Sequence, residues 1–197
     1  LLTDASERIL SGLLALAGIV SENMVRDAGW YLLDTGRGLE RALQVLALLQ
    51  ATVCAERPWD TERLVVEAVL TATESIVTFR RRYGGRDRVE AAVELLVTDA
   101  RNPRSVAYQL ERIAADLRAI PNTSAALRPP RLAEALVHQV QTVDLGAMSA
   151  APGRAELGEF LVGLRTQLRD LADAIRDQYQ QLPPAPQPMR TRAGGAA

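Results

Sequence analysis

Two short strings that combine glutamate and arginine hold the side chains best suited to chemistry. One is Glu40-Arg41 and the other is Glu111-Arg112, each preceded by a leucine. A glutamate can act as a general acid or base, and the planar guanidinium of arginine can hold a carboxylate or phosphate through two hydrogen bonds. The two strings therefore point either to ion pairs or to a site for an anionic ligand. With their polar neighbours, the candidate ligand-binding or network residues are Arg37, Glu40, Arg41, Arg104, Tyr108, Glu111 and Arg112.

Helices must position these residues, because side chains three, four or seven apart share one helical face. Arg37 lies three residues before Glu40, and Arg104 lies seven residues before Glu111 with Tyr108 between them. On separate helices such charges would form surface pairs worth about 0.3–0.5 kcal/mol each. If the two polar faces meet, they form a partly buried network or a cradle for an anion. Both interpretations stay open from the residues alone.

The spacing of apolar residues predicts helices throughout the chain. Apolar side chains recur four and three positions apart, and no stretch alternates with the period of two that marks a strand. Asp27, Asp60 and Asn102 are each placed to cap the start of a helix, and Gly84 is placed to end one. We predict an all-α fold, an antiparallel bundle of about six to seven helices. The expected helices cover 9–20, 28–55, 60–83, 89–96, 102–120, 129–143 and 157–182.

The domain organisation follows from composition along the chain. The helical bundle is expected to fill residues 1–182 as one domain. Residues 146–153 are rich in Gly, Ala, Ser and Pro, which predicts a flexible connection before the last helix. From 183 to 197 the chain is rich first in Pro and then in Gly and Ala, which predicts a disordered tail.

The composition excludes several classes of chemistry. All 23 basic residues are arginine, so no lysine can form a Schiff base or bind phosphate in a P-loop. The formal net charge of −1 gives no bulk attraction to nucleic acid or to an anionic membrane, although 80–86 is locally basic. A single cysteine, Cys54, cannot form an internal disulfide, which fits a cytoplasmic location. No apolar run is long enough to span a bilayer, so we expect neither a membrane nor a nucleic-acid partner.

No metal or cofactor is expected in this domain. Glu134 and His138 are spaced four apart, as a helical metal pair would be, but His138 is the only histidine and a di-metal bundle usually needs two. Gly36 and Gly38 do not form a phosphate loop, because no strand precedes them. They are expected instead to allow a close approach between helices.

The longer strings around these motifs resemble the alpha-E domain family, a bacterial family of helical domains named for its helices and its Glu-Arg motif. The resemblance rests on residues 22–30 running into 33–42, then on 79–83, then on 102–112. It covers most of the chain before the tail. The family's usual N-terminal portion, with its own Glu-Arg helix, has no counterpart here, which predicts a C-terminal fragment of a larger domain.

The resemblance implies a partner. Members of the family are typically fused to, or encoded beside, a circularly permuted ATP-grasp protein, which implies a part in ATP-dependent carboxylate–amine ligation. No catalytic residue carries over from the family. The leading expectation is therefore a non-catalytic accessory module that binds such a ligase, or its peptide substrate, in peptide or protein modification.

Two other functional classes stay open. The chain could be an enzyme that uses Glu40 or Glu111 as an acid or base, among arginines that hold an anionic substrate. This requires the two glutamates to converge on a pocket. It could also be a structural oligomerisation domain driven by the coiled-coil-like apolar seam of 157–182, which requires that seam to be free to pair.

Overall fold

The computed structural model describes residues 2–84, 88–150 and 152–179. Within these ranges the chain forms nine α-helices and no β-strand, which confirms the all-α prediction. A π-helical turn, Glu94–Thr98, follows the fifth helix, and a 3-10 turn, Pro152–Arg154, precedes the ninth. The α-helices are α1 (Leu2–Asn23), α2 (Ala28–Thr52), α3 (Trp59–Ala72), α4 (Ile76–Tyr83), α5 (Val89–Val93), α6 (Val106–Ala119), α7 (Arg128–Thr142), α8 (Leu145–Ala150) and α9 (Ala155–Tyr179).

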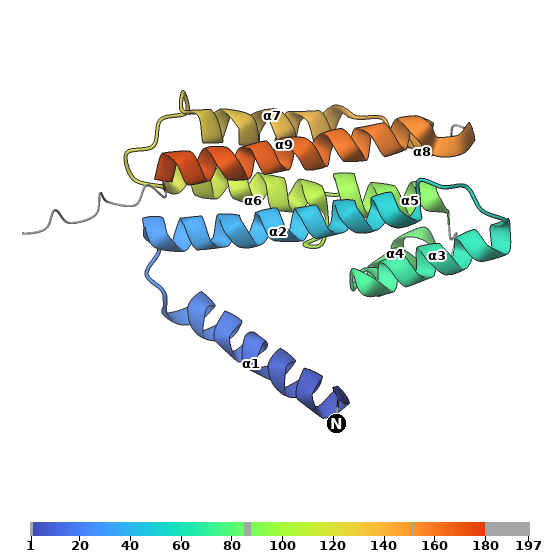
Figure 1. Ribbon diagram of the computed structural model, residues 1–197, viewed down its shortest axis with the longest axis horizontal. Helices are drawn as coiled ribbons and strands as arrows, with labels where there is room; N and C mark the ends of the chain where they lie inside the picture. The colour runs from blue at the N-terminus through green and yellow to red at the C-terminus, as the bar shows by residue number, and fades with distance from the viewer. Residues whose placement is uncertain (1, 85–87, 151, 180–197) are drawn as a thin grey trace, which may run out of the picture.

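Four long helices form the bundle. The helix α2 packs against α6 and α9, and α7 packs against the same two helices. The chain direction reverses between each of these neighbours, so the bundle is antiparallel, as predicted (Figure 1). The helices α3, α4, α5 and α8 gather at one end of it.

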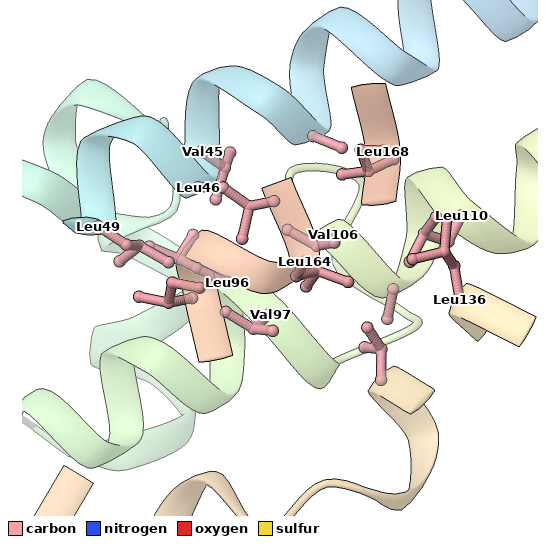
Figure 2. Close-up of a cluster of buried hydrophobic side chains, with 14 of the residues drawn as sticks. Val45, Leu46, Leu49, Leu96, Val97, Val106, Leu110, Leu136, Leu164 and Leu168 are labelled. Atoms are coloured by element: carbon pink, nitrogen blue, oxygen red, sulfur yellow. The ribbon is translucent and has the colours of Figure 1, made fainter. Parts of the chain in front are cut away.

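Aliphatic side chains from all four long helices fill the core. The π-helical turn adds three further side chains, Leu95, Leu96 and Val97, to the same cluster, so the turn is a structural part of the core. Each buried leucine contributes about 1.5–3 kcal/mol relative to an exposed one. The buried residues labelled in Figure 2 are Val45, Leu46, Leu49, Leu96, Val97, Val106, Leu110, Leu136, Leu164 and Leu168.

The apolar seam of the last helix is buried inside this chain. Its side chains pack where α9 meets α2 and α7, and every described member of the seam is at most 5% exposed. The seam is therefore not free to pair with another chain. The prediction of a structural oligomerisation domain driven by this seam was wrong. The described seam residues are Leu157, Leu161, Leu164, Leu168, Leu171 and Ile175.

The predicted helix caps have mixed outcomes. A side-chain oxygen of Asp27 accepts the N–H of Trp30 at 3.1 Å, which confirms the cap of α2. The cap at Asp60 was wrong, because α3 begins one residue earlier and follows Pro58 without a side-chain cap. The predicted end at Gly84 is confirmed, since this residue takes the left-handed conformation with φ 60°.

The start of α6 also differs from the prediction. Asn102 does not cap it; its buried amide instead donates to the carbonyl of Leu95 at 3.0 Å and holds the preceding loop. Ser105 is the cap, and its hydroxyl accepts the N–H of Tyr108 at 3.1 Å. A serine at this position satisfies a backbone donor that the helix leaves free.

The helix predicted over 60–83 is broken into α3 and α4. The break is a Schellman turn: the N–H of Glu74 donates to the carbonyl of Thr71 at 3.0 Å, and the N–H of Ser75 donates to Leu70 at 2.8 Å. Glu74 adopts φ 52°, a left-handed conformation that usually belongs to glycine. This costs an ordinary residue about 1–2 kcal/mol. The prediction failed because no glycine or proline marks the turn.

The connection over 146–153 is ordered where the structure describes it, which corrects the prediction of a flexible stretch. It contains most of α8, followed by the 3-10 turn. The buried Arg154 fixes this segment, because its guanidinium donates to the carboxylate of Glu62 at 2.6 Å and to the carbonyl of Val53 at 3.2 Å. The tail predicted over 183–197 lies outside the described residues.

The helix α1 projects away from the bundle (Figure 1). Six of its large apolar side chains are between 55% and 65% exposed. Among the described helices, none combines the length and apolarity needed to cross a membrane. The exposed apolar residues of α1 are Ile9, Leu10, Leu13, Leu14, Leu16 and Ile19.

Candidate functional site at the interface of α2 and α6

The two helices that carry the Glu-Arg strings pack directly on each other. A glycine lets them approach closely: a Cβ atom at Gly38 would lie 2.9 Å from Cγ1 of Ile113, inside the closest distance that carbon atoms tolerate. The expectation of close approach is therefore confirmed at Gly38. It was wrong at Gly36, where a Cβ would meet nothing within 4 Å.

This difference gives a matched pair of variants. Gly38→Ala should destabilise the fold by about 1 kcal/mol, because forcing Ile113 aside costs more than the roughly 1 kcal/mol of helix propensity that alanine adds. Gly36→Ala adds the same propensity without a clash, so it should stabilise by about 0.5–1 kcal/mol. Urea unfolding followed by circular dichroism measures both. Equal stabilisation by the two variants would show that Gly38 is not needed for close packing.

A charged group is buried where the two helices meet. The guanidinium of Arg112 holds Asp34 through two hydrogen bonds, with Nη2 donating to Oδ1 at 2.7 Å and Nε donating to Oδ2. Asp34 is only 6% exposed, and the pair joins α2 to α6 across the bundle. Burial opposes the charge on Arg112, but the hydrogen bond and the charge of Asp34 outweigh it and raise the pKa of Arg112.

A second carboxyl group, Asp116, lies beside this pair. Its Oδ2 oxygen is buried and receives no hydrogen bond. Burial first, and then the neighbouring Asp34, raise the pKa of Asp116 to about 7, although the charge of Arg112 opposes the shift. A proton on Asp116 makes this residue a donor toward Asp34, and one proton and one guanidinium then stabilise two carboxyl groups.

The charged contact between α2 and α6 is therefore made by aspartates and not by the glutamates of the two strings. Arg112 of the second string takes part in it, but its partners are Asp34 and Asp116. Arg112 and Asp116 are four residues apart on one face of α6, a spacing that could have indicated the pair. No sequence signal showed that Asp34 would face them.

The two glutamates of the strings are not brought together. Glu40 is exposed and accepts a hydrogen bond from Gln44 on its own helix at 3.0 Å. Glu111 accepts one from Gln141 of α7 at 3.1 Å. They line separate hollows of the surface, and Arg37 lies in the hollow with Glu40.

Arg41 and Arg104 do share a cavity. It has a volume of about 280 Å³ and lies between α2, the end of α3 and the start of α6. Arg104 also forms an ion pair with Glu74, the residue in the strained turn. Glu74 is a site residue that sequence reasoning missed, because its place depends on a turn that the sequence does not reveal. In the sequence, the half-buried Tyr108 lies midway between Arg104, which lines this cavity, and Arg112, which belongs to the buried ion pair.

Comparison with known families identifies the chain. The family model Alpha-E, described as a predicted alpha-helical domain with a conserved ER motif, matches residues 2–179. The chain belongs to the Alpha-E family. The packed helices α2 and α6 of this Alpha-E domain each carry one Glu-Arg string.

Curated relatives of the Alpha-E domain are much longer than this chain. Uncharacterized proteins from Mycobacterium bovis and from two strains of Mycobacterium tuberculosis are 41% identical to it over 191 residues. The match covers 95% of this chain and 22% of each relative, so the chain spans about a fifth of their length. No solved structure matches the chain.

The other candidate groups of the Alpha-E domain are the basic cluster and Cys54, and they form ion pairs or are partly buried. In the basic cluster, Arg80 pairs with Glu67 at 2.6 Å and Arg82 pairs with Asp99. Cys54 is half-buried, and burial raises the pKa of its thiol. Over the described ranges, no three side chains of His, Cys, Asp or Glu gather as a metal ion would require.

Proposed function

We propose that this Alpha-E domain is a non-catalytic helical binding module that works with a circularly permuted ATP-grasp ligase in peptide or protein modification. The ligase can be part of the same polypeptide or a separate chain. The observation that carries the proposal is the apolar face of α1, which lies outside the bundle.

The exposed face of α1 has the character of an interaction surface. Large contiguous apolar patches are rare on proteins that act alone, and they mark sites where another protein packs. Asp4, Glu7, Arg8 and Glu22 lie together on the opposite side of the helix, so α1 is amphipathic. An amphipathic helix of this kind binds by placing its apolar side in a groove of the partner.

The arrangement of charges supports a binding role over a catalytic one. The buried carboxylate of Asp34 is bonded to Arg112 inside the helix interface, and the carboxyl group of Asp116 lies beside this pair. Glu40 and Glu111 lie in separate surface hollows, each bound to a glutamine. A general acid or base acts in hydrogen-bond reach of a reacting group, together with a second positioned group.

Co-purification with the ATP-grasp protein tests the proposal. The tagged Alpha-E domain should retain the ligase on a column, and Leu13→Asp should weaken the complex at least about tenfold, since a buried hot-spot side chain is worth more than about 1–2 kcal/mol. Leu64→Asp on α3 is the matched control, because Leu64 and Leu13 are both 58% exposed. Failure of the unmodified domain to bind the ligase would refute the partnership, and equal loss in both variants would refute the role of α1.

A further inference from the structure

The cavity between Arg41 and Arg104 has the composition of a ligand site. Three apolar residues line it, Val45, Leu48 and Ala72, and we call them its floor. The polar lining residues form what we call its rim, and they are Arg41, Gln44, Thr73, Glu74 and Arg104. Sites for small molecules are apolar hollows of about 300–1,000 Å³ with a few convergent polar groups. At about 280 Å³, this cavity lies just below that range.

Among the described residues, one of its two cations is paired with no carboxylate. Arg104 pairs with Glu74, whereas no carboxylate in the described part of the chain pairs with Arg41. The two arginines and one glutamate leave a net charge of +1 on the rim. An unpaired guanidinium beside an apolar floor can hold an anionic group whose carbon chain enters the hollow.

The strained turn places the third charged group. Glu74 occupies the position of a Schellman turn that glycine normally takes, and its side chain reaches Arg104. Strained residues of this kind concentrate at functional sites. The carboxylate of Glu74 pairs with Arg104 and reduces the positive charge of the rim, which disfavours a doubly charged anion such as phosphate.

We infer that this cavity binds the carboxylate of a small apolar molecule, such as the C-terminal residue of a peptide, between Arg41 and Arg104. The apolar floor selects an organic anion, and the single net charge selects a monoanion. The inference does not depend on the ATP-grasp partnership, because it rests only on the cavity and on the charges at its rim.

Ligand titration monitored by NMR tests the site. N-acetyl-leucine should bind with a Kd below about 10 mM, while its uncharged amide and inorganic phosphate should bind at least about fivefold more weakly. Arg41→Gln should weaken N-acetyl-leucine about tenfold, the usual loss when a charge-assisted hydrogen bond is removed. Arg37→Gln, on the same helix but outside this cavity, should leave the Kd unchanged.

A third variant separates binding from folding. Glu74→Gly relieves the strained backbone, so it should stay folded, and it should tighten N-acetyl-leucine about threefold because a competing acid is removed. Absence of binding, equal binding of acid and amide, equal binding of phosphate, or equal losses at Arg37 and Arg41 would each overturn the inference.

Discussion

Replacing Arg112 by alanine is expected to destabilise the Alpha-E domain by about 2–3 kcal/mol at neutral pH. Removing one partner of a buried ion pair costs about 3–5 kcal/mol, because the other charge stays buried without compensation. The side chain of Arg112 is 38% exposed, which reduces the cost, whereas that of Asp34 is only 7% exposed. Urea unfolding at pH 7.5, followed by circular dichroism, measures the change.

Arg118→Ala is the matched control on the same helix. Arg118 is exposed, and its guanidinium donates to the carbonyl of Ala114 within α6, so its loss should change stability by less than about 0.5 kcal/mol. Arg112→Lys should fall between the two, because a lysine keeps the charge but cannot form the two-point contact. Equal effects at Arg112 and Arg118 would show that the buried pair adds nothing.

The second large effect is a loss of stability as the pH rises from about 4 to about 7. The pKa of Asp116 is raised to about 7 in the folded protein, and an unfolded aspartate titrates near 3.9. Between these values the folded state keeps a proton that the unfolded state has released, so the free energy of unfolding must fall with rising pH. We expect a total fall of about 2–4 kcal/mol from this group, which levels off above pH 7.

Asp116→Asn isolates this contribution. An asparagine is neutral at every pH and can donate to Asp34, so it imitates the protonated acid. The variant should lose the part of the slope between pH 4 and 7 that Asp116 causes, and it should be more stable than the unmodified domain at pH 8. A slope that is unchanged in Asp116→Asn would assign the pH dependence to other groups.

The sequence predicted the helices better than their ends. The spacing of Val106, Leu110 and Ile113 identifies the buried face of α6, because helical periodicity depends on many apolar residues at once. A helix cap depends on one side chain, and any of several polar residues near the start of a helix can supply it. Asn102 was predicted as the cap of α6, but Ser105 caps this helix and the amide of Asn102 holds a buried loop.

The candidate site was predicted only in part. Helical spacing placed Arg41 and Arg104 on polar faces, and the packing of α2 on α6 brought both to one cavity. The pairing of Arg112 with Asp34 depends on the rotation of one helix against the other, which the close approach at Gly38 fixes. Glu74 enters through a turn without glycine or proline, so the sequence carries no residue that marks the turn.

The position of α2 between α6 and α9 has a consequence for folding during synthesis. One side of α2 is covered by α6 and another side by α9. The last residue of α9 comes 127 residues after the last residue of α2. At about 5–20 residues per second, a ribosome needs about 6–25 s to synthesise these residues. For this time the side of α2 that α9 will cover stays open to chaperones and to other nascent chains. Cooperative folding of the domain therefore waits for its last helix to leave the ribosome.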